Sequence, residues 1–92
     1  MTELALERTE RTQDHVSIGE SAPYALLVDD EPAILRALAR ALKGRGCQVA
    51  TAGDGMSALR LVATQDFDVV VTDLTMPGMD GLTLTERIRE TH

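Results

Sequence analysis

Three aspartates that follow apolar runs are the residues whose types and positions point most directly to chemistry. Asp29 and Asp30 come directly after the run Tyr24–Val28, and Asp73 ends the run Val69–Asp73. In an open parallel sheet, ligands bind outside the carboxyl ends of the strands, so acids that end two strands can converge on one spot. Clustered carboxylates repel one another unless a cation compensates them, and all-oxygen ligands suit a hard ion such as Mg²⁺. The pattern predicts a divalent-cation site.

The elements that must position these acids alternate between strand and helix. Continuous or β-branched apolar runs predict strands covered on both faces, and Pro32 favours the start of a helix. The predicted strands are Tyr24–Val28, Cys47–Thr51 and Phe67–Thr72, and the predicted helices begin at Pro32, after Asp54, and at Gly81, the last running to Glu90. This alternation predicts a parallel sheet with helical crossovers, an α/β fold.

Polar residues before each predicted helix are candidates for its cap, and apolar residues within it are candidates for the core. Asp30 or Glu31 is expected to cap the first helix, Asp54 the second and Asp80 the third. The expected core residues of the helices are Ile34, Leu38, Ala41 and Leu42 in the first, Ala58, Leu59 and Val62 in the second, and Leu82, Leu84 and Ile88 in the third.

The first 22 residues differ in composition from the rest. They carry several acids, few large apolar residues and no sustained period, which predicts a mobile N-terminal extension over residues 1–22. At most, a transient helix is expected near Glu3 to Gln13. Pro23 marks the boundary, and the 92-residue chain has room for one domain, over residues 23–92.

Composition excludes several classes of function. The net charge is −6 and no Lys/Arg cluster is present, so no nucleic-acid surface is expected. The longest apolar runs are about strand length and no signal-peptide pattern begins the chain, so we expect no membrane segment and a cytoplasmic location. Cys47 is the single cysteine, which excludes an internal disulfide, and it is interpreted as a small buried thiol.

Two segments resemble the receiver domain of bacterial two-component response regulators. They are Leu26–Pro32, which reads LVDDEP after its first leucine, and Val69–Gly81, which reads VVVTDLTMPGMDG. The resemblance runs from about Tyr24 to the C-terminus, with the acid pair, the strand-terminal Asp and the loop in the family's order. It implies a flavodoxin-like doubly wound parallel sheet, incomplete here, with strands one to three and helices one to three present.

The resemblance also implies the chemistry of each acid. Asp73 matches the phospho-acceptor, which takes a phosphoryl group from a phosphohistidine on a sensor histidine kinase or phosphotransfer protein. Asp29 and Asp30 match the acids that hold Mg²⁺, and Asp73 and the backbone carbonyl of Thr75 complete the protein's ligands. Such a module is a signalling phospho-acceptor rather than an enzyme. Pro77 and Gly78 are interpreted as an ordinary turn in the loop.

The second half of the family pattern is not found in this sequence. The family places a Ser or Thr at the end of strand four and a Lys at the end of strand five, and the only lysine here, Lys43, falls in the first helix. Losing strands four and five would expose the edge of strand three at Val69 to Val71, so the isolated chain is expected to self-associate through that edge, to swap elements or to be only partly folded. The alternative function is a truncated, non-phosphorylated interaction module that binds a kinase or another receiver.

Other interpretations of the same residues are weaker. A hydrolase of the haloacid dehalogenase type also pairs strand-end aspartates with Mg²⁺, but its signature is Asp-x-Asp, whereas Asp29 and Asp30 are adjacent. Glu31 is interpreted as a favourable charge at a helix N-terminus rather than as a residue near the metal. His15 and His92 are interpreted as surface histidines, because no helix bundle displays them.

Overall fold

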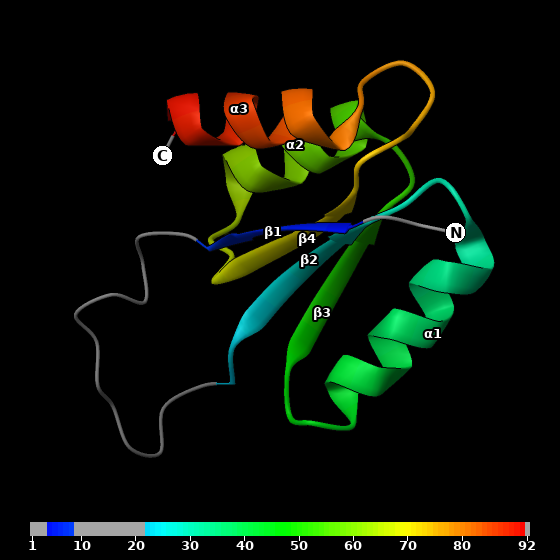
Figure 1. The fold of residues 1–92 in the computed structure, drawn as a ribbon. Helices are drawn as coiled ribbons and strands as arrows, with labels where there is room; N and C mark the ends of the chain where they lie inside the picture. The colour runs from blue at the N-terminus through cyan, green and yellow to red at the C-terminus, as the bar shows by residue number, and fades with distance from the viewer. Residues whose placement is uncertain (1–3, 9–21, 92) are drawn as a thin grey trace.

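The computed structural model describes residues 4–8 and 22–91 as a four-stranded sheet with helices on both faces (Figure 1). The strands are β1 (Leu4–Arg8), β2 (Tyr24–Val28), β3 (Gln48–Ala52) and β4 (Val69–Asp73), and the helices are α1 (Pro32–Lys43), α2 (Gly55–Thr64) and α3 (Gly81–Thr91). The strand order is β1-β4-β2-β3, in which β2 is parallel to both β3 and β4 and β1 is antiparallel to β4. The α/β class and the three parallel strands are confirmed.

The most buried strand, β2, lies between β3 and β4. Its residues Ala25 to Val28 are at most 1% exposed, as expected for a continuous apolar run in a parallel sheet covered on both faces. Val28 pairs with Ala52 on one side and with Thr72 on the other. The carboxyl ends of the three parallel strands therefore lie at one end of the sheet.

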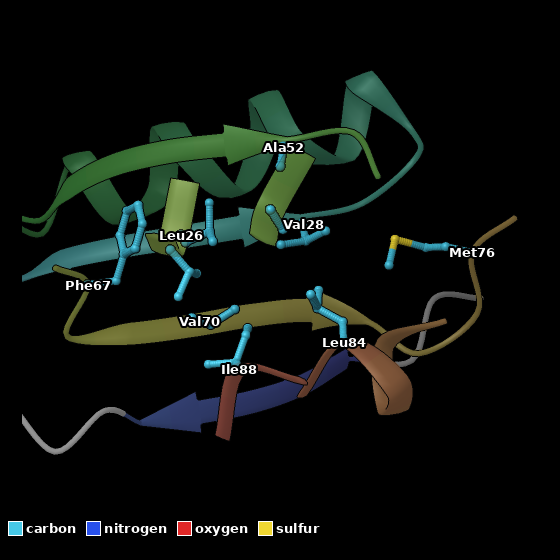
Figure 2. Packing of buried hydrophobic residues seen from close by; sticks show 10 residues of the cluster. Leu26, Val28, Ala52, Phe67, Val70, Met76, Leu84 and Ile88 are labelled. Carbon is cyan, nitrogen blue, oxygen red and sulfur yellow. The ribbon is translucent and has the colours of Figure 1, made fainter. Parts of the chain in front are cut away.

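The main core fills the face that α2 and α3 cover, and Figure 2 shows it as one cluster of aliphatic side chains. Its buried members are Leu26, Val28, Ala52, Ala58, Val62, Phe67, Val70, Met76, Leu84 and Ile88. The ring of Phe67 also packs on that of Tyr24, with centroids 4.5 Å apart. The large share of Val, Leu and Ile matches the composition, in which aromatic residues are only 2%.

Among the described helices, α1 alone covers the opposite face of the sheet (Figure 1). None of the residues Pro32–Lys43 is fully buried, and the predicted stripe is half-buried at Ile34, Leu38 and Leu42 and exposed at Ala41. On β4, Val69 and Val71 are also half-buried. The prediction that this stripe lies in the core is therefore only partly correct, because α1 is the single described helix on this side.

Helix starts follow the sequence signals with one exception, at α1. Asp54 and Asp80 cap α2 and α3 as predicted, accepting hydrogen bonds from Ser57 N (2.7 Å) and Thr83 N (2.8 Å). Glu31 occupies the cap position of α1, but its side chain makes no capping hydrogen bond. Pro32 at the first turn lacks the N–H that a capping side chain would otherwise help to satisfy.

One predicted core residue lies at the surface. Leu82 is 62% exposed, whereas Leu84 and Ile88 of the same helix are buried. Leu82 is the second residue of α3 and lies about 200° around the helix from Leu84, so the two cannot share one face. Strands β3 and β4 begin one and two residues later than predicted, which leaves the alternation of elements unchanged.

The N-terminal region holds the largest correction to the sequence prediction. Residues 4–8 form β1 and pair with the side of β4 that was expected to be an open edge, with Leu6 opposite Val71. The prediction of a mobile extension is thus wrong for these five residues, and the premise of self-association through an unpaired Val69–Val71 edge fails. Unpaired ladder groups on an edge strand recruit an available extended segment. Residues 1–3, 9–21 and 92, with His15 and His92, lie outside the described residues.

Candidate metal centre

The structure brings the three predicted acids together at the carboxyl end of the sheet. Asp29, Asp30 and Asp73 each offer a carboxylate oxygen, and these oxygens lie within 4.8 Å of one another. Asp29 and Asp73 are buried, at 1% and 5% exposure, whereas Asp30 is exposed. Strand order explains the convergence, because β2 and β4 are parallel neighbours whose following residues meet at the same edge.

Asp29 is held where β2 leads into α1. Its N–H donates to Ala52 O on β3 (3.2 Å), which extends the pairing between β2 and β3 by one bond. Its Oδ1 accepts a hydrogen bond from Glu31 N (2.9 Å), so the carboxylate itself shapes the turn before Pro32. The role of helix capping that Asp30 or Glu31 was expected to fill is thus taken in part by Asp29.

The second oxygen of Asp29 is the atom that points most directly to cation binding. Within the described part of the chain, Oδ2 is the one buried side-chain oxygen or nitrogen without a hydrogen-bond partner. Burial raises the pKa of Asp29 above its ordinary value, and the charges of Asp73 and Asp30 raise it further, against the lowering effect of the Glu31 N–H. A cation at this position would satisfy Oδ2 and favour the ionised form. The acids therefore fit a hard cation such as Mg²⁺.

Asp73 is fixed by its own loop and by α3. Its Oδ1 accepts a hydrogen bond from Thr75 N (3.1 Å), and its backbone oxygen accepts one from the Thr72 hydroxyl (3.0 Å). A Cβ added at Gly81 would lie 2.1 Å from Asp73 O, so α3 begins in direct contact with the backbone of Asp73. Only glycine allows this approach.

The loop between β4 and α3 combines a turn with a hydrophobic anchor. Gly78 has a φ of +84°, which agrees with the interpretation of Pro77 and Gly78 as a turn. Met76 is buried in the core, and Met79 is half-buried and packs against the same cluster. Thr75 contributes its N–H to Asp73, and a metal contact from its carbonyl stays a prediction.

Two residues at the site were not singled out from the sequence. Gly81 sets the distance between α3 and Asp73, and Gly55 sets the distance between α2 and the loop, since a Cβ there would lie 2.8 Å from Met79 Cβ. Both follow the cap residue of a helix, at Asp80 and Asp54. An Asp-Gly pair at a helix start is also an ordinary turn signal, so the sequence alone does not reveal the contact.

The other chemistry-bearing residues lie apart from the acid cluster. Lys43, the only lysine, is exposed in the last turn of α1, and Cys47 is a half-buried free thiol before β3 rather than a buried one. Within the described residues, no helix is long and apolar enough to cross a membrane.

Comparison with known proteins agrees with this geometry. Residues 25–92 match the family model of the response regulator receiver domain. The chain is 37% identical over 90 residues to the sensor histidine kinase GacS of Pseudomonas protegens, covering 98% of this chain and 10% of that protein. It is 42% identical over 69 residues to the transcriptional regulatory protein AfsQ1 of Streptomyces coelicolor, covering 75% of this chain and 31% of that protein.

Solved structures show the same fold. The chemotaxis protein CheY4 of Vibrio cholerae is 30% identical with a TM-score of 0.72, over 77% of this chain and 59% of that one. A receiver domain protein of Clostridium thermocellum is 28% identical with a TM-score of 0.71, over 75% of this chain and 56% of that one. The strand order, the acid cluster and these similarities together establish that residues 25–92 belong to the response regulator receiver domain family.

Proposed function

We propose that this chain is a receiver module that accepts a phosphoryl group on Asp73 in a Mg²⁺-dependent phosphorelay. The donor is the phosphohistidine of a sensor histidine kinase or a phosphotransfer protein. The observation that carries the proposal is the cluster of Asp29, Asp30 and Asp73, with oxygens within 4.8 Å and the buried Asp29 Oδ2 unpaired. A structural role alone would leave no reason to bury an acid beside two others.

The residues proposed to hold Mg²⁺ are Asp29, Asp30, Asp73 and the backbone carbonyl of Thr75. The ion, when bound, would offset the repulsion between the negative charges of the carboxylates and those of the phosphoryl oxygens. The raised pKa of Asp29 supports this assignment, because the ionised form is disfavoured by burial until a cation compensates it.

Asp73 is proposed as the nucleophile. An oxygen of its carboxylate forms a bond to phosphorus while the bond between phosphorus and the imidazole nitrogen of the donor breaks. The nitrogen takes up a proton, and the product is an aspartyl phosphate. Thr75 N already donates to Oδ1, so we assign Oδ2 as the attacking oxygen.

The protein's own contribution to this transfer is position rather than bond-making. Thr75 N and the Thr72 hydroxyl hold the carboxylate and the backbone of Asp73, and Gly81 lets α3 support the same residue. Transfer of a phosphoryl group depends chiefly on such alignment and on charge compensation.

The chain spans about a tenth of the length of the curated kinase and about a third of the curated regulator described above. Kinase or transcriptional activity belongs to those proteins. For this chain we propose a kinase or phosphotransfer partner, no nucleic-acid contact by its own residues, and a cytoplasmic location. It acts as a signalling domain rather than as an enzyme with turnover.

The test is phosphorylation by a small phosphodonor. The chain is incubated with acetyl phosphate and Mg²⁺, and intact mass and peptide mapping are measured. We expect one added phosphoryl group at Asp73, lost in Asp73→Asn and strongly reduced in Asp29→Asn and Asp30→Asn. Asp66→Asn is the matched control, because Asp66 is an exposed acid in the loop after α2. A folded chain that stays unmodified would favour the alternative, a non-phosphorylated interaction module.

A further inference from the structure

The loop between β4 and α3, residues 74–80, holds Thr75 beside Asp73. The base of the loop is closed, because Gly81 N donates a hydrogen bond to Leu74 O (3.0 Å). Thr75 itself is exposed, and its N–H donates to Asp73 Oδ1 (3.1 Å). An exposed loop residue keeps a defined position only where buried side chains of the same loop anchor it. The side chains that anchor this loop therefore decide where Thr75 lies.

Two methionines anchor the loop. Met76 is buried, and Figure 2 shows its side chain pointing from the loop toward the core cluster. Met79 is half-buried and packs against the same cluster. Between them the chain turns at Gly78, where φ is +84°. Both methionines thus tie the loop to the body of the protein, one on each side of the turn.

The Met79 side chain lies directly against the backbone of Gly55, the first residue of α2. A Cβ added at Gly55 would lie 2.8 Å from both Cβ and Sδ of Met79 and 3.0 Å from its Cγ. A close-packed interior leaves no room for such an atom, so only glycine permits this contact. The Cβ of Met79 is bonded to the loop backbone. A change in this contact therefore displaces the loop itself and not only the end of a flexible side chain.

The start of α2 gives this contact a fixed base. Asp54 Oδ1 accepts a hydrogen bond from Ser57 N (2.7 Å), and Asp54 O accepts one from Ala58 N (3.1 Å). These bonds close the first turn of the helix through both the side chain and the backbone of its cap residue. Ala58, in the same turn, is fully buried in the core. The loop therefore takes its position from α2 through Gly55.

We propose that Met79, packed on Gly55, is a positioning residue for the metal site, and that this contact sets the Mg²⁺ affinity through the placement of Thr75. The inference rests on the proposed function, in which Asp73 and Thr75 belong to that site. It extends the proposed function by assigning part of the control of metal binding to α2, which carries none of the proposed ligands.

A Mg²⁺ titration of folded variants, followed by backbone amide resonances in NMR spectra, tests the proposal. Met79→Ala removes the contact without adding an atom, so the Mg²⁺ dissociation constant should rise about tenfold, as when the outer support of a metal ligand is lost. Met79→Leu nearly conserves the volume and should keep an affinity near that of the unmodified chain. Leu61→Ala is the matched control, because Leu61 is also half-buried against the core cluster, roughly 9 Å along α2 from Gly55. It should lower stability and leave the affinity unchanged.

Gly55→Ala tests the other side of the contact. Its added Cβ would displace Met79, so the Mg²⁺ dissociation constant should rise, whereas Met56→Ala at the exposed next position should have no effect. Without Mg²⁺, Gly55→Ala should also shift the amide resonance of Thr75, because the hydrogen bond from Thr75 N–H to Asp73 moves with the loop. This second readout does not depend on the metal.

The possible results separate this proposal from the proposed function. If the unmodified chain binds Mg²⁺ and folded Met79→Ala binds it as tightly as Leu61→Ala does, the role of Met79 is overturned and the proposed function stands. If the unmodified chain shows no saturable binding, the proposed metal site falls and this proposal falls with it. Should Gly55→Ala fail to fold, the comparison of Met79→Ala with Leu61→Ala still decides, since neither variant introduces a clash.

Discussion

The two faces of the sheet differ in how much they bury. On the face under α2 and α3, both the sheet and a helix contribute fully buried residues, such as Leu26 and Val70 from the strands and Leu84 and Ile88 from α3. The strand residues Ala25 and Leu27 are also buried but lie outside that cluster, and α1 contributes no fully buried residue. Hydrophobic stabilisation scales with the apolar area removed from water. The helices α2 and α3 are therefore expected to contribute more of it than α1.

The acid cluster contains residues that are linked to helices on both faces of the sheet. Asp29 leads from β2 into α1, on the lightly packed side, and Asp73 is supported by Gly81 at the start of α3, on the well-packed side. This difference suggests a division of roles, in which α3 fixes the nucleophile and the α1 side remains adjustable around the metal ligands. The following experiments test that division.

Matched leucine substitutions should show the largest difference. Leu84→Ala, at 0% exposure in α3, is expected to lower the free energy of unfolding by about 2–5 kcal/mol. Leu38→Ala, at a half-buried position of α1, should cost less than about 1.5 kcal/mol, because less apolar area is lost. Urea denaturation followed by circular dichroism measures both. Equal costs would contradict the unequal packing of the two faces.

A methyl group at Gly81 should damage both stability and chemistry. Its Cβ would lie 2.1 Å from Asp73 O, a backbone atom that cannot move aside freely, so Gly81→Ala should cost about 1–3 kcal/mol and reduce phosphate incorporation at Asp73. Gly53→Ala is the control, since nothing lies within 4 Å of its added Cβ. A Gly81→Ala chain with unchanged stability and labelling would show that α3 does not position Asp73.

The ionisation of Asp29 should appear as a pH-dependent loss of stability. Because its pKa is raised in the folded state, the proton stabilises the fold below the ordinary value of 3.8, and this stability is lost as pH rises through the higher folded pKa. Without metal at pH 7, Asp29→Asn should be more stable than the unmodified chain, because it removes a charge whose burial is unfavourable. The asparagine can still accept from Glu31 N.

The control is the same comparison of Asp29→Asn with the unmodified chain at acid pH, where the difference in stability should disappear. The two chains should converge in stability when unfolding is measured below pH 3.8, where Asp29 is protonated in both states. A constant difference at every pH would mean that the substitution acts through packing and not through charge.

The smallest expected effects are at the helix caps. Asp54→Ala and Asp80→Ala each remove a hydrogen bond to a first-turn N–H, so the melting temperature should fall by a few degrees, with Asp66→Ala as the control. Hydrogen bonds from Ser57 and Thr83 lower the pKa of these carboxyls, so their stabilisation is present above the ordinary value of 3.8 and lost as pH falls through the lowered value. If the drop in melting temperature were the same at every pH, the ionised form of these carboxylates would not be the one that stabilises the helix ends.

Most of the parallel sheet and its acid cluster could be predicted from local sequence. The run Tyr24–Val28 is apolar throughout, Pro32 marks a helix start, and Asp54 and Asp80 are cap residues, so each signal lies within a few residues of its effect. The convergence of Asp29 and Asp73 followed from the rule that ligands collect at the carboxyl ends of parallel strands.

The features that depend on distant neighbours were not predictable in the same way. Leu4–Arg8 has no strong strand signal, because Glu7 and Arg8 follow a short apolar stretch, and it becomes a strand only beside the edge of β4. The partial exposure of α1 and of Leu82 depends on what else packs on those faces. The contact of Gly81 with Asp73 is likewise set by the assembled fold.

The measurement that tests the account most directly is a Mg²⁺ titration of the unmodified chain, Asp29→Asn, Asp73→Asn and the control Asp66→Asn, with the free energy of unfolding as the readout. We predict saturable stabilisation of the unmodified and control chains, by about 1.4 kcal/mol at ten times the dissociation constant, and little or none in the other two. The stability advantage of Asp29→Asn should then shrink or reverse. Equal stabilisation of all four chains would show that the acid cluster is not the metal site and would contradict the proposed chemistry at Asp73.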